Sequence, residues 1–468
     1  MRAGWWLAWV AVGALGFAPR LTGAPPNIIH ILADDVGYDD FGCFGCKDIA
    51  TPNVDALAAR GTRFTSFYAP HPTCTASRAA LLTGCYAVRV GLPPVLFPDS
   101  KIGLNADEVT IAELLKAKGY ATACVGKWHL GHQSKFLPTH HGFDRFLGIP
   151  YPNDHVPERL DKNGKTRGFP PMPLIRDLRV VEQPAQMAAL PERFTKEAEA
   201  FIAENKNRPF FLHLANVETH TPWLVPRPYQ YTSKAGVYGD AVRCFDATVG
   251  RVVAAVEKAG LTANTLIVVT SDNGPLVHEY PELEGIYGHA AAVDTARRHV
   301  LREGKYQARY EGGSRVACVV AWPGTVPAGR TCDEVVAGFD LFTTFAKLAG
   351  ADVPADRVID GKDVTPLLKG EPGAKSPHAA FYSYQGPNLM AVRVGNWKLV
   401  FPAGGPKKAG KPELYDLAAN LGETTNLYAS QPDVVKRLEA VAEAARTDLG
   451  DARTGRKGKN LRPAGTAE

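Results

Sequence analysis

Short apolar segments alternate with longer amphipathic segments over the first two thirds of the 468-residue chain, and this alternation constrains the fold most strongly. Asn27–Ala33 (NIIHILA) is apolar except for two residues, as expected for a strand buried on both faces. The same character recurs at Tyr120–Val125, Pro209–Ala215, Leu266–Thr270 and Ala317–Ala321. Between these predicted strands, apolar residues recur at helical spacing and predict helices at Asn53–Arg60, Ser77–Thr83, Val109–Lys118, Pro191–Glu204 and Val237–Lys258. The sequence therefore predicts an α/β fold, with a large, mostly parallel sheet flanked by helices.

The pattern changes after residue 375, where short strand-like segments replace the alternation. Asn388–Val400 predicts a hairpin that turns at Gly395-Asn396, because both residues favour tight turns. Glu413–Leu417 predicts another strand, and Pro432–Arg446 predicts a helix. We therefore expect a main domain at 25–375, a smaller α+β C-terminal subdomain at 376–446, and a basic, loosely ordered tail at 447–468.

Residues 1–24 have the organisation of a secretory signal peptide. Arg2 supplies positive charge, Trp5–Phe17 is continuously apolar, and Thr22-Gly23-Ala24 offers small residues for cleavage. The alternative is a buried first helix, but the next segment already predicts a core strand. No later segment is long and apolar enough to cross a bilayer. The sequence predicts export to a periplasm or out of the cell, without stable membrane insertion.

The net charge gives no reason to expect nucleic acid as a partner. The formal charge of +5 falls to +3 without Arg2 and Arg20, and the tail from Thr447 contributes +2 of that remainder. The folded body is therefore close to neutral, whereas nucleic-acid-binding domains carry a concentrated basic surface.

The chain has eight cysteines, and an exported protein can form disulfides. Cys43 and Cys46 are spaced as in zinc or redox motifs, but no second pair or suitably spaced histidine accompanies them. We interpret them as structural. Cys124, Cys244 and Cys318 lie among apolar neighbours and are expected to be buried.

Two acidic clusters directly follow apolar strands. Asp34-Asp35 follows NIIHILA, and Asp272-Asn273-Gly274 follows LIVVT. Ligands of parallel α/β sheets gather at the carboxyl ends of the strands, and carboxylate and amide oxygens suit calcium or magnesium better than zinc. Taken singly, the first cluster could be a solvated loop or helix cap and the second a turn. Together they predict an all-oxygen cation site.

A third cluster surrounds Cys74, in the segment His71–Gly84 (HPTCTASRAALLTG). Cys74 lies at the predicted start of a helix, where free N–H groups favour anions and a thiolate. The residues alone are therefore consistent with a cysteine nucleophile, an anion-binding turn or an inert helix-start cysteine.

Lysine and histidine residues form the fourth cluster. Lys127 and His129 stand in GKWHLG after one predicted strand, and His220 stands in ETHTP after another. Such residues can clamp an anion and move protons, although single histidines are more often structural. Lys305 is a weaker candidate, because lone lysines are mostly solvated.

These motifs resemble the formylglycine-dependent sulfatase family of the alkaline-phosphatase-like superfamily, most closely its arylsulfatase branch. The similarity runs from about Asn27 to about Leu427. Its most specific element is the Cys-x-Pro/Ala-x-Arg motif, here CTASR continued as AALLTG, followed by GKWHLG, ELYDL and GET. The resemblance implies that residues 25–375 form the catalytic domain of an enzyme that hydrolyses sulfate esters, such as those of sulfated carbohydrates.

The resemblance also implies a cofactor and a maturation step. A separate formylglycine-generating enzyme would oxidise Cys74 to formylglycine, whose hydrate has one hydroxyl to attack sulfur and a second that allows sulfate to leave. One calcium ion would be held by Asp34, Asp35, Asp272 and Asn273, with the modified residue 74 completing the site.

The remaining roles follow from the same resemblance. Arg78 would steady the modified side chain, and Lys127 and Lys305 would hold the sulfate oxygens. His129 would act as the base on the aldehyde hydrate, while His220 would donate a proton or a hydrogen bond to the leaving oxygen.

The sequence departs from the family pattern at three places. Ala76 replaces the commoner proline of the motif, and Cys85 stands where arginine is frequent. The segment Gly274–Gly304 is longer than usual and contains His278, His289 and His299, which suggests either a wall of the substrate pocket or a solvated insertion. Tyr151–His155 is similarly either a border of the pocket or a simple turn.

Two other functions are considered. A phosphoester or phosphonate hydrolase of the same superfamily would be expected to use an unmodified nucleophile and two transition metals with several histidine ligands. A sulfated-glycan-binding pseudoenzyme would be expected to lack part of the catalytic set, whereas every position that can be matched is filled.

Overall fold

The computed structural model describes residues 24–467, apart from 162, 278–298 and 405–409. The predicted signal peptide therefore lies outside the described residues, except for Ala24. Among the described residues, no helix combines the length and apolar character needed to span a membrane.

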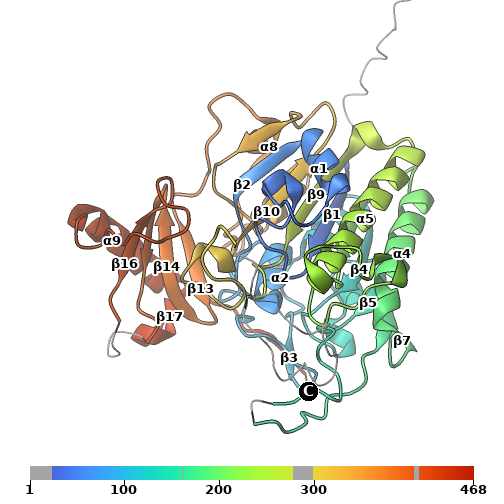
Figure 1. The fold of residues 1–468 in the computed structure, drawn as a ribbon, viewed down its shortest axis with the longest axis horizontal. Helices are drawn as coiled ribbons and strands as arrows, with labels where there is room; N and C mark the ends of the chain where they lie inside the picture. Colours follow the sequence, from blue (N-terminus) through green and yellow to red (C-terminus); the bar gives the residue numbers. More distant parts are fainter. Residues whose placement is uncertain (1–23, 162, 278–298, 405–409, 468) are drawn as a thin grey trace, which may run out of the picture.

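An 11-stranded mixed sheet forms the centre of the molecule, in the order β11-β2-β10-β9-β1-β8-β4-β5-β6-β7, with β12 also paired to β2 (Figure 1). The five strands from β9 to β5 are parallel to one another, whereas β10, β6 and β7 pair in antiparallel fashion. The strands are β1 (Asn27–Ala33), β2 (Thr62–Tyr68), β4 (Ala121–Lys127), β5 (Arg145–Ile149), β6 (Leu174–Arg176), β7 (Arg179–Glu182), β8 (Phe210–Ala215), β9 (Thr265–Ser271), β10 (Arg315–Ala321), β11 (Arg330–Cys332) and β12 (Val336–Ala337).

Helices cover both faces of this sheet, as the apolar strands predict. Along β1, Ile29 and Ile31 join one buried cluster, while Ile28 and Leu32 join the other, because successive side chains point to opposite faces. The first face is covered by α1 (Pro52–Ala59), α4 (Leu190–Glu204) and α5 (Gly236–Lys258). The second is covered by α2 (Cys74–Thr83), α3 (Ile111–Lys116), α7 (Asp340–Leu348) and α8 (Thr365–Lys369). The predicted α/β fold is thus confirmed.

The C-terminal subdomain is a separate antiparallel sheet with a helix packed against it, at the left of Figure 1. The predicted hairpin is present, with Val394 opposite Trp397 and Gly395 at a positive φ of 57°. Its elements are β13 (Phe381–Gln385), β14 (Asn388–Val394), β15 (Trp397–Val400), β16 (Glu413–Asp416), α9 (Pro432–Asp448), β17 (Gly450–Asp451) and β18 (Arg456–Lys457).

The C-terminal tail corrects the sequence-based prediction. Residues 447–467 do not form a loose extension but return to the main domain, where β19 (Gly465–Thr466) pairs with β3 (Ile102–Gly103). Figure 1 shows the C-terminus beside β3, away from α9. Arg462 donates to both carboxylate oxygens of the buried Glu108, at 2.6 and 2.9 Å. The basic residues that suggest a solvated tail therefore include one that neutralises a buried acid.

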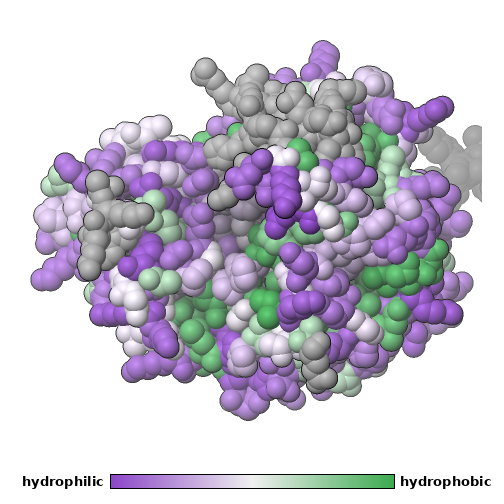
Figure 2. Space-filling model, turned by 90° about the horizontal axis from the view of Figure 1, so that it is seen from below, coloured by the Kyte–Doolittle hydropathy of each residue, from purple (hydrophilic) through white to green (hydrophobic). Residues whose placement is uncertain are grey.

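Figure 2 shows a face on which hydrophilic side chains predominate and hydrophobic ones form separate patches. The described cysteines form no disulfide, and Cys124, Cys244 and Cys318 are buried as expected.

A buried charge cluster joins the two domains. The Nζ atom of Lys398, on β15, lies 2.9 Å from Glu311 and 2.8 Å from Glu423. Burial alone would raise the pKa of Glu311, but Lys398 and Arg315 offset it and hold that pKa at about 2. Since this value lies below the ordinary value of 4.5, the stabilisation is present above about pH 4.5 and is lost as the pH falls towards 2.

We expect Lys398→Met to lower the free energy of unfolding by about 3–5 kcal/mol at neutral pH, because it leaves the buried Glu423 without its cation and removes one of the cations that face Glu311. Lys436→Met, which removes an exposed lysine of α9, should change it by less than about 0.5 kcal/mol. Urea denaturation of both variants measures the difference. Equal unfolding midpoints would contradict a role for the cluster in joining the domains.

Candidate active site

Three aspartates meet where β1 and β9 end, as the sequence predicts. The two strands are parallel neighbours in register, with Ala33 opposite Ser271, so the residues that follow them lie side by side. The backbone N–H of Asp272 donates to the carbonyl of Ala33 at 3.1 Å, and that of Asp35 donates to the Asp272 carboxylate at 3.2 Å. Asp34, Asp35 and Asp272 are all buried.

Each of these carboxylates faces a buried cation. Lys127 reaches Asp34 at 2.7 Å, and Lys305 reaches Asp35 at the same distance. Arg78 lies 2.8 Å from Asp272 and 3.4 Å from Asp34, and it also donates to the carbonyl of Lys127 at 2.9 Å. The structure therefore brings together the predicted lysine, arginine and aspartate residues, including Lys305, which the sequence marks only weakly.

The neighbouring cations offset the burial of the three aspartates to different extents. Burial would raise the pKa of Asp34, but the charges of Lys127 and Arg78 hold it well below its usual range. Burial and the nearby Asp34 raise the pKa of Asp272 to about 6, and burial also raises the pKa of Asp35 despite Lys305. An additional positive charge would therefore favour the fully ionised cluster.

The donor atoms fit a hard divalent cation. Asn273 donates through Nδ2 to Asp35 at 2.7 Å, while its Oδ1 atom is buried without a hydrogen-bond partner among the described residues. Three carboxylates and this amide oxygen match the oxygen-rich ligand sets of calcium and magnesium. The Sγ atom of Cys74 and the Nε2 atom of His220 also lie close to Asp34 and Asp35.

Cys74 begins α2, and its Sγ atom lies 3.9 Å from Asp34. The helix start would favour a thiolate, but burial raises the pKa of the thiol to about 11 although Lys127 and Lys305 oppose it. Burial thus outweighs the local preference of a helix N-terminus for negative charge. An unmodified Cys74 is a protonated thiol at neutral pH and a poor nucleophile.

His129 and His220 are both buried and neutral. Burial lowers the pKa of each well below its ordinary value, with Lys127 adding to the effect at His129 and Lys305 at His220. His129 donates through Nε2 to the Leu96 carbonyl at 2.9 Å, so its Nδ1 atom is left as an acceptor, buried without a partner among the described residues. Its positive φ of 62° is rare for this residue type and fits a functional position.

His220 has the opposite arrangement. It donates through Nδ1 to the Thr221 carbonyl at 2.5 Å, and its Nε2 atom accepts from Lys305 at 2.9 Å. A lysine ammonium and an imidazole therefore form a hydrogen-bonded pair at the edge of the cluster, suitable for delivering a proton to a leaving oxygen.

Several residues of the site are missed by the sequence analysis. The hydroxyl of Thr219 accepts from the Asp34 N–H at 3.1 Å, and Leu96 orients His129 only through its backbone carbonyl. A backbone contact carries no side-chain signal, so Leu96 could not have been found. Asn153, in contrast, lies within the singled-out segment Tyr151–His155, and it donates to the carbonyl of His220 at 3.2 Å.

The long segment Gly274–Gly304 is only partly described. His278 and His289 lie outside the described residues, so the expected pocket wall stays a prediction. His299 is described, and its Nδ1 atom lies 2.8 Å from Asp39.

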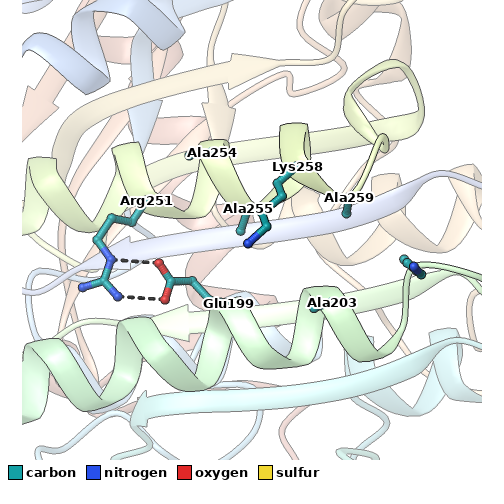
Figure 3. A pocket seen from close by; sticks show the side chains of 8 residues that line it. Glu199, Ala203, Arg251, Ala254, Ala255, Lys258 and Ala259 are labelled. Carbon is teal, nitrogen blue, oxygen red and sulfur yellow. Dashed lines mark hydrogen bonds and ion pairs between the residues drawn. The ribbon is translucent and has the colours of Figure 1, made fainter.

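A separate groove of about 470 Å³ lies between α4 and α5 (Figure 3). Arg251 forms a bidentate pair with Glu199 there, at 2.7 and 2.8 Å, alongside small side chains such as Ala255. None of its lining residues belongs to the cluster of aspartates, lysines and histidines, so the groove is not the catalytic site.

Comparison with known proteins agrees with this geometry. A family model described as Sulfatase matches residues 26–351, and a second, described as N-sulphoglucosamine sulphohydrolase, C-terminal, matches residues 304–448. Arylsulfatase A of Homo sapiens is 39% identical over 455 residues, which cover 89% of this chain and 86% of the relative. N-acetylgalactosamine-6-sulfatase of Canis lupus familiaris is 38% identical, over 85% of this chain and 75% of the relative.

Solved structures give the same result. Ps i-CgsB, in complex with k-i-k-neocarrahexaose, superposes with a TM-score of 0.77 at 29% identity, covering 93% of this chain and 95% of that one. BT33336S-sulf, from work on glycosaminoglycan metabolism by Bacteroides thetaiotaomicron, gives 0.76 at 28% identity, covering 91% and 100%. Fold and site thus define a hydrolase of the alkaline-phosphatase-like superfamily. Within it, the chain belongs to the sulfatase family and is a sulfuric ester hydrolase.

We expect Cys74 of the unmodified, metal-free protein to react with iodoacetamide more slowly at pH 8 than free cysteine does, because its thiol stays protonated. The rate should rise with pH towards a midpoint near the pKa of about 11. Peptide mass spectrometry of timed samples gives the labelling rate at each cysteine. Fast labelling of Cys74 below pH 8 would show that the helix N-terminus outweighs burial.

Proposed function

We propose that the protein releases inorganic sulfate from sulfated saccharides by means of a formylglycine formed from Cys74 and one bound calcium ion. The observation that supports this most directly is the position of Cys74. It stands in a CTASR motif at the start of α2, 3.9 Å from an aspartate of the oxygen-rich cluster. Cys74 is a poor nucleophile as a protonated thiol, and its conversion into formylglycine would give this position a catalytic role.

The calcium ion would be held by the oxygens of Asp34, Asp35, Asp272 and Asn273, together with modified residue 74. When both groups are present, the aldehyde hydrate supplies the nucleophile and the cation counters negative charge beside it. Calcium is proposed because the donor atoms are oxygens, and no group of several histidines accompanies them among the described residues. Oxygen donors of this kind suit a hard cation.

The surrounding side chains have distinct roles in this proposal. Lys127 and Lys305 bind the sulfate oxygens and stabilise the charge that develops there. Arg78 steadies residue 74, four residues earlier on the same helix, and holds Asp272 through a hydrogen bond from Nε at 2.9 Å. The free Nδ1 atom of His129 accepts the proton that must leave residue 74, and His220, paired with Lys305, hydrogen-bonds the departing oxygen.

The substrate class and location are part of the same proposal. A named relative acts on N-acetylgalactosamine 6-sulfate, and a structural relative is seen with a neocarrahexaose, which supports a saccharide sulfate as substrate. Export to the periplasm or the exterior is supported by the apolar segment Trp5–Phe17. We place the catalytic domain at 25–375 and the C-terminal subdomain at 376–446.

Maturation can be tested by mass. Trypsin releases Cys74 within the peptide Phe64–Arg78 and Cys85 within Ala79–Arg89. After co-expression with a formylglycine-generating enzyme, we expect the first peptide to have the mass of the aldehyde or its hydrate and the second to retain its thiol. Cys74→Ala should lower hydrolysis of 4-nitrophenyl sulfate by roughly three orders of magnitude or more. An intact Cys74, with a control sulfatase matured in the same cells, would refute the formylglycine assignment.

Calcium dependence can be tested by removal and replacement. We expect chelation to lower both activity and melting temperature, since three buried carboxylates lose their shared counter-charge, and calcium to restore both. Asp272→Asn should weaken the calcium-induced rise in melting temperature, whereas Asp433→Asn, at an exposed position on α9, should leave it unchanged. Restoration by zinc but not calcium would contradict the proposed metal.

A further inference from the structure

An aromatic wall, formed by Phe97, His155 and Phe169, lies beside the catalytic cluster. The ring of His155 stacks on Phe97, with centroids 4.8 Å apart, and lies 5.4 Å from Phe169. Phe97 and Phe169 are themselves 6.1 Å apart. The three side chains come from separate segments and meet only in the folded protein.

The wall is directly connected to the residues around the nucleophile. His155 lies 6.1 Å, ring to ring, from His129. Leu96, the neighbour of Phe97, accepts a hydrogen bond from His129 at 2.9 Å and donates one to the Thr75 hydroxyl at 3.2 Å. The part of a substrate that extends beyond the sulfate on this side therefore meets the wall.

Arg167 lies against the wall and exposes a guanidinium group to solvent. Its Cζ atom is 4.4 Å from the ring centroid of Phe97 and 4.8 Å from that of Phe169, so two cation–π contacts fix its position. Among the described residues, no carboxylate pairs with it, whereas its neighbour Arg159 forms an ion pair with Asp154. A positioned guanidinium without an acidic partner is suited to bind an anionic group from outside.

The charges that face His155 have the same sign. Lys127, Arg167 and Lys305 all lie near enough to act on it, while Asp154, 3.8 Å away, is already engaged by Arg159. The Nδ1 atom of His155 is buried without a hydrogen-bond partner among the described residues. The neighbourhood thus offers positive charge, aromatic surface and polar atoms without a hydrogen-bond partner among the described residues, a combination suited to an anionic saccharide.

We infer that Arg167 determines specificity by binding a second anionic group of the substrate, on the basis of the saccharide sulfatase activity proposed above. The preferred substrate then carries a further sulfate or carboxylate on the sugar adjoining the one that is desulfated. Phe97 and Phe169 hold the guanidinium in place, the sugar lies against the part-exposed Phe97, and His155 hydrogen-bonds a hydroxyl group. A substrate with a single negative charge leaves Arg167 without a partner.

The test compares two competitors of 4-nitrophenyl sulfate hydrolysis by the matured enzyme. One is N-acetylgalactosamine 6-sulfate, with a single anionic group, and the other is a chondroitin disaccharide with two sulfates and a uronate carboxylate. We expect the disaccharide to inhibit the wild type at least about ten times more strongly than the monosaccharide, because a charge-assisted guanidinium contact is worth about that factor. Raising the salt concentration should reduce this preference.

Arg167→Ala should lower the preference about tenfold, and Arg167→Lys should lower it less, because charge is kept while the planar group is lost. Arg179→Ala removes an exposed arginine of β7 and should leave the preference unchanged. The inference is overturned if the wild type shows no preference, or if Arg167→Ala retains it, or if both alanine variants lose it equally. Failure of the matured wild type to hydrolyse 4-nitrophenyl sulfate would instead count against the proposed function.

Discussion

The active site depends on the burial of three carboxylates against three cations at one edge of the sheet. Ionised groups that are removed from water are costly unless each finds a partner, and removal of one partner leaves the other exposed to the full cost. Asp34, Asp35 and Asp272 are therefore stable here only because Lys127, Lys305 and Arg78 reach them. These pairs form only if several strands end at matching positions along the sheet. The geometry of the cluster therefore depends on the sheet.

Under the proposed function, the same pairing would link cation binding to sulfate binding. Lys127 and Lys305 each lie 2.7 Å from an aspartate. A divalent cation on those oxygens would compete with the lysines for the same negative charge, and the ammonium groups would then be available to an anion. Two ligands of opposite charge that each favour the same arrangement of side chains bind with positive coupling. In the proposed mechanism the two lysines would therefore serve both as counter-ions of the aspartates and as ligands of the sulfate.

Much of this arrangement can be predicted from sequence, because strand order and register convert local patterns into neighbours. Asp34 and Asp272 each follow a mainly apolar strand, and parallel pairing of those strands brings them together. The state of Cys74 could not be predicted in this way. Its position at a helix start indicates a stabilised thiolate, whereas the depth of burial, which only the assembled fold determines, raises the pKa of the thiol. Arg167 was missed for a similar reason, because its position depends on the ring of Phe97, from a distant segment, as well as on that of nearby Phe169.

The C-terminal part of the chain also contacts the segments on either side of α2, the helix that begins at Cys74. Ahead of Cys74, His71 accepts a hydrogen bond from the N–H of Gly386 at 3.0 Å, in the turn between β13 and β14. Beyond the end of α2, Arg89 is shared between Asp360, at 2.7 Å, and Asp448 of α9, at 2.6 Å. In the tail, Arg462 approaches the sulfur of Cys85 at 3.3 Å. The small subdomain and the tail therefore fix α2 from outside the large sheet, and the position of Cys74 relative to the aspartates depends on the complete chain.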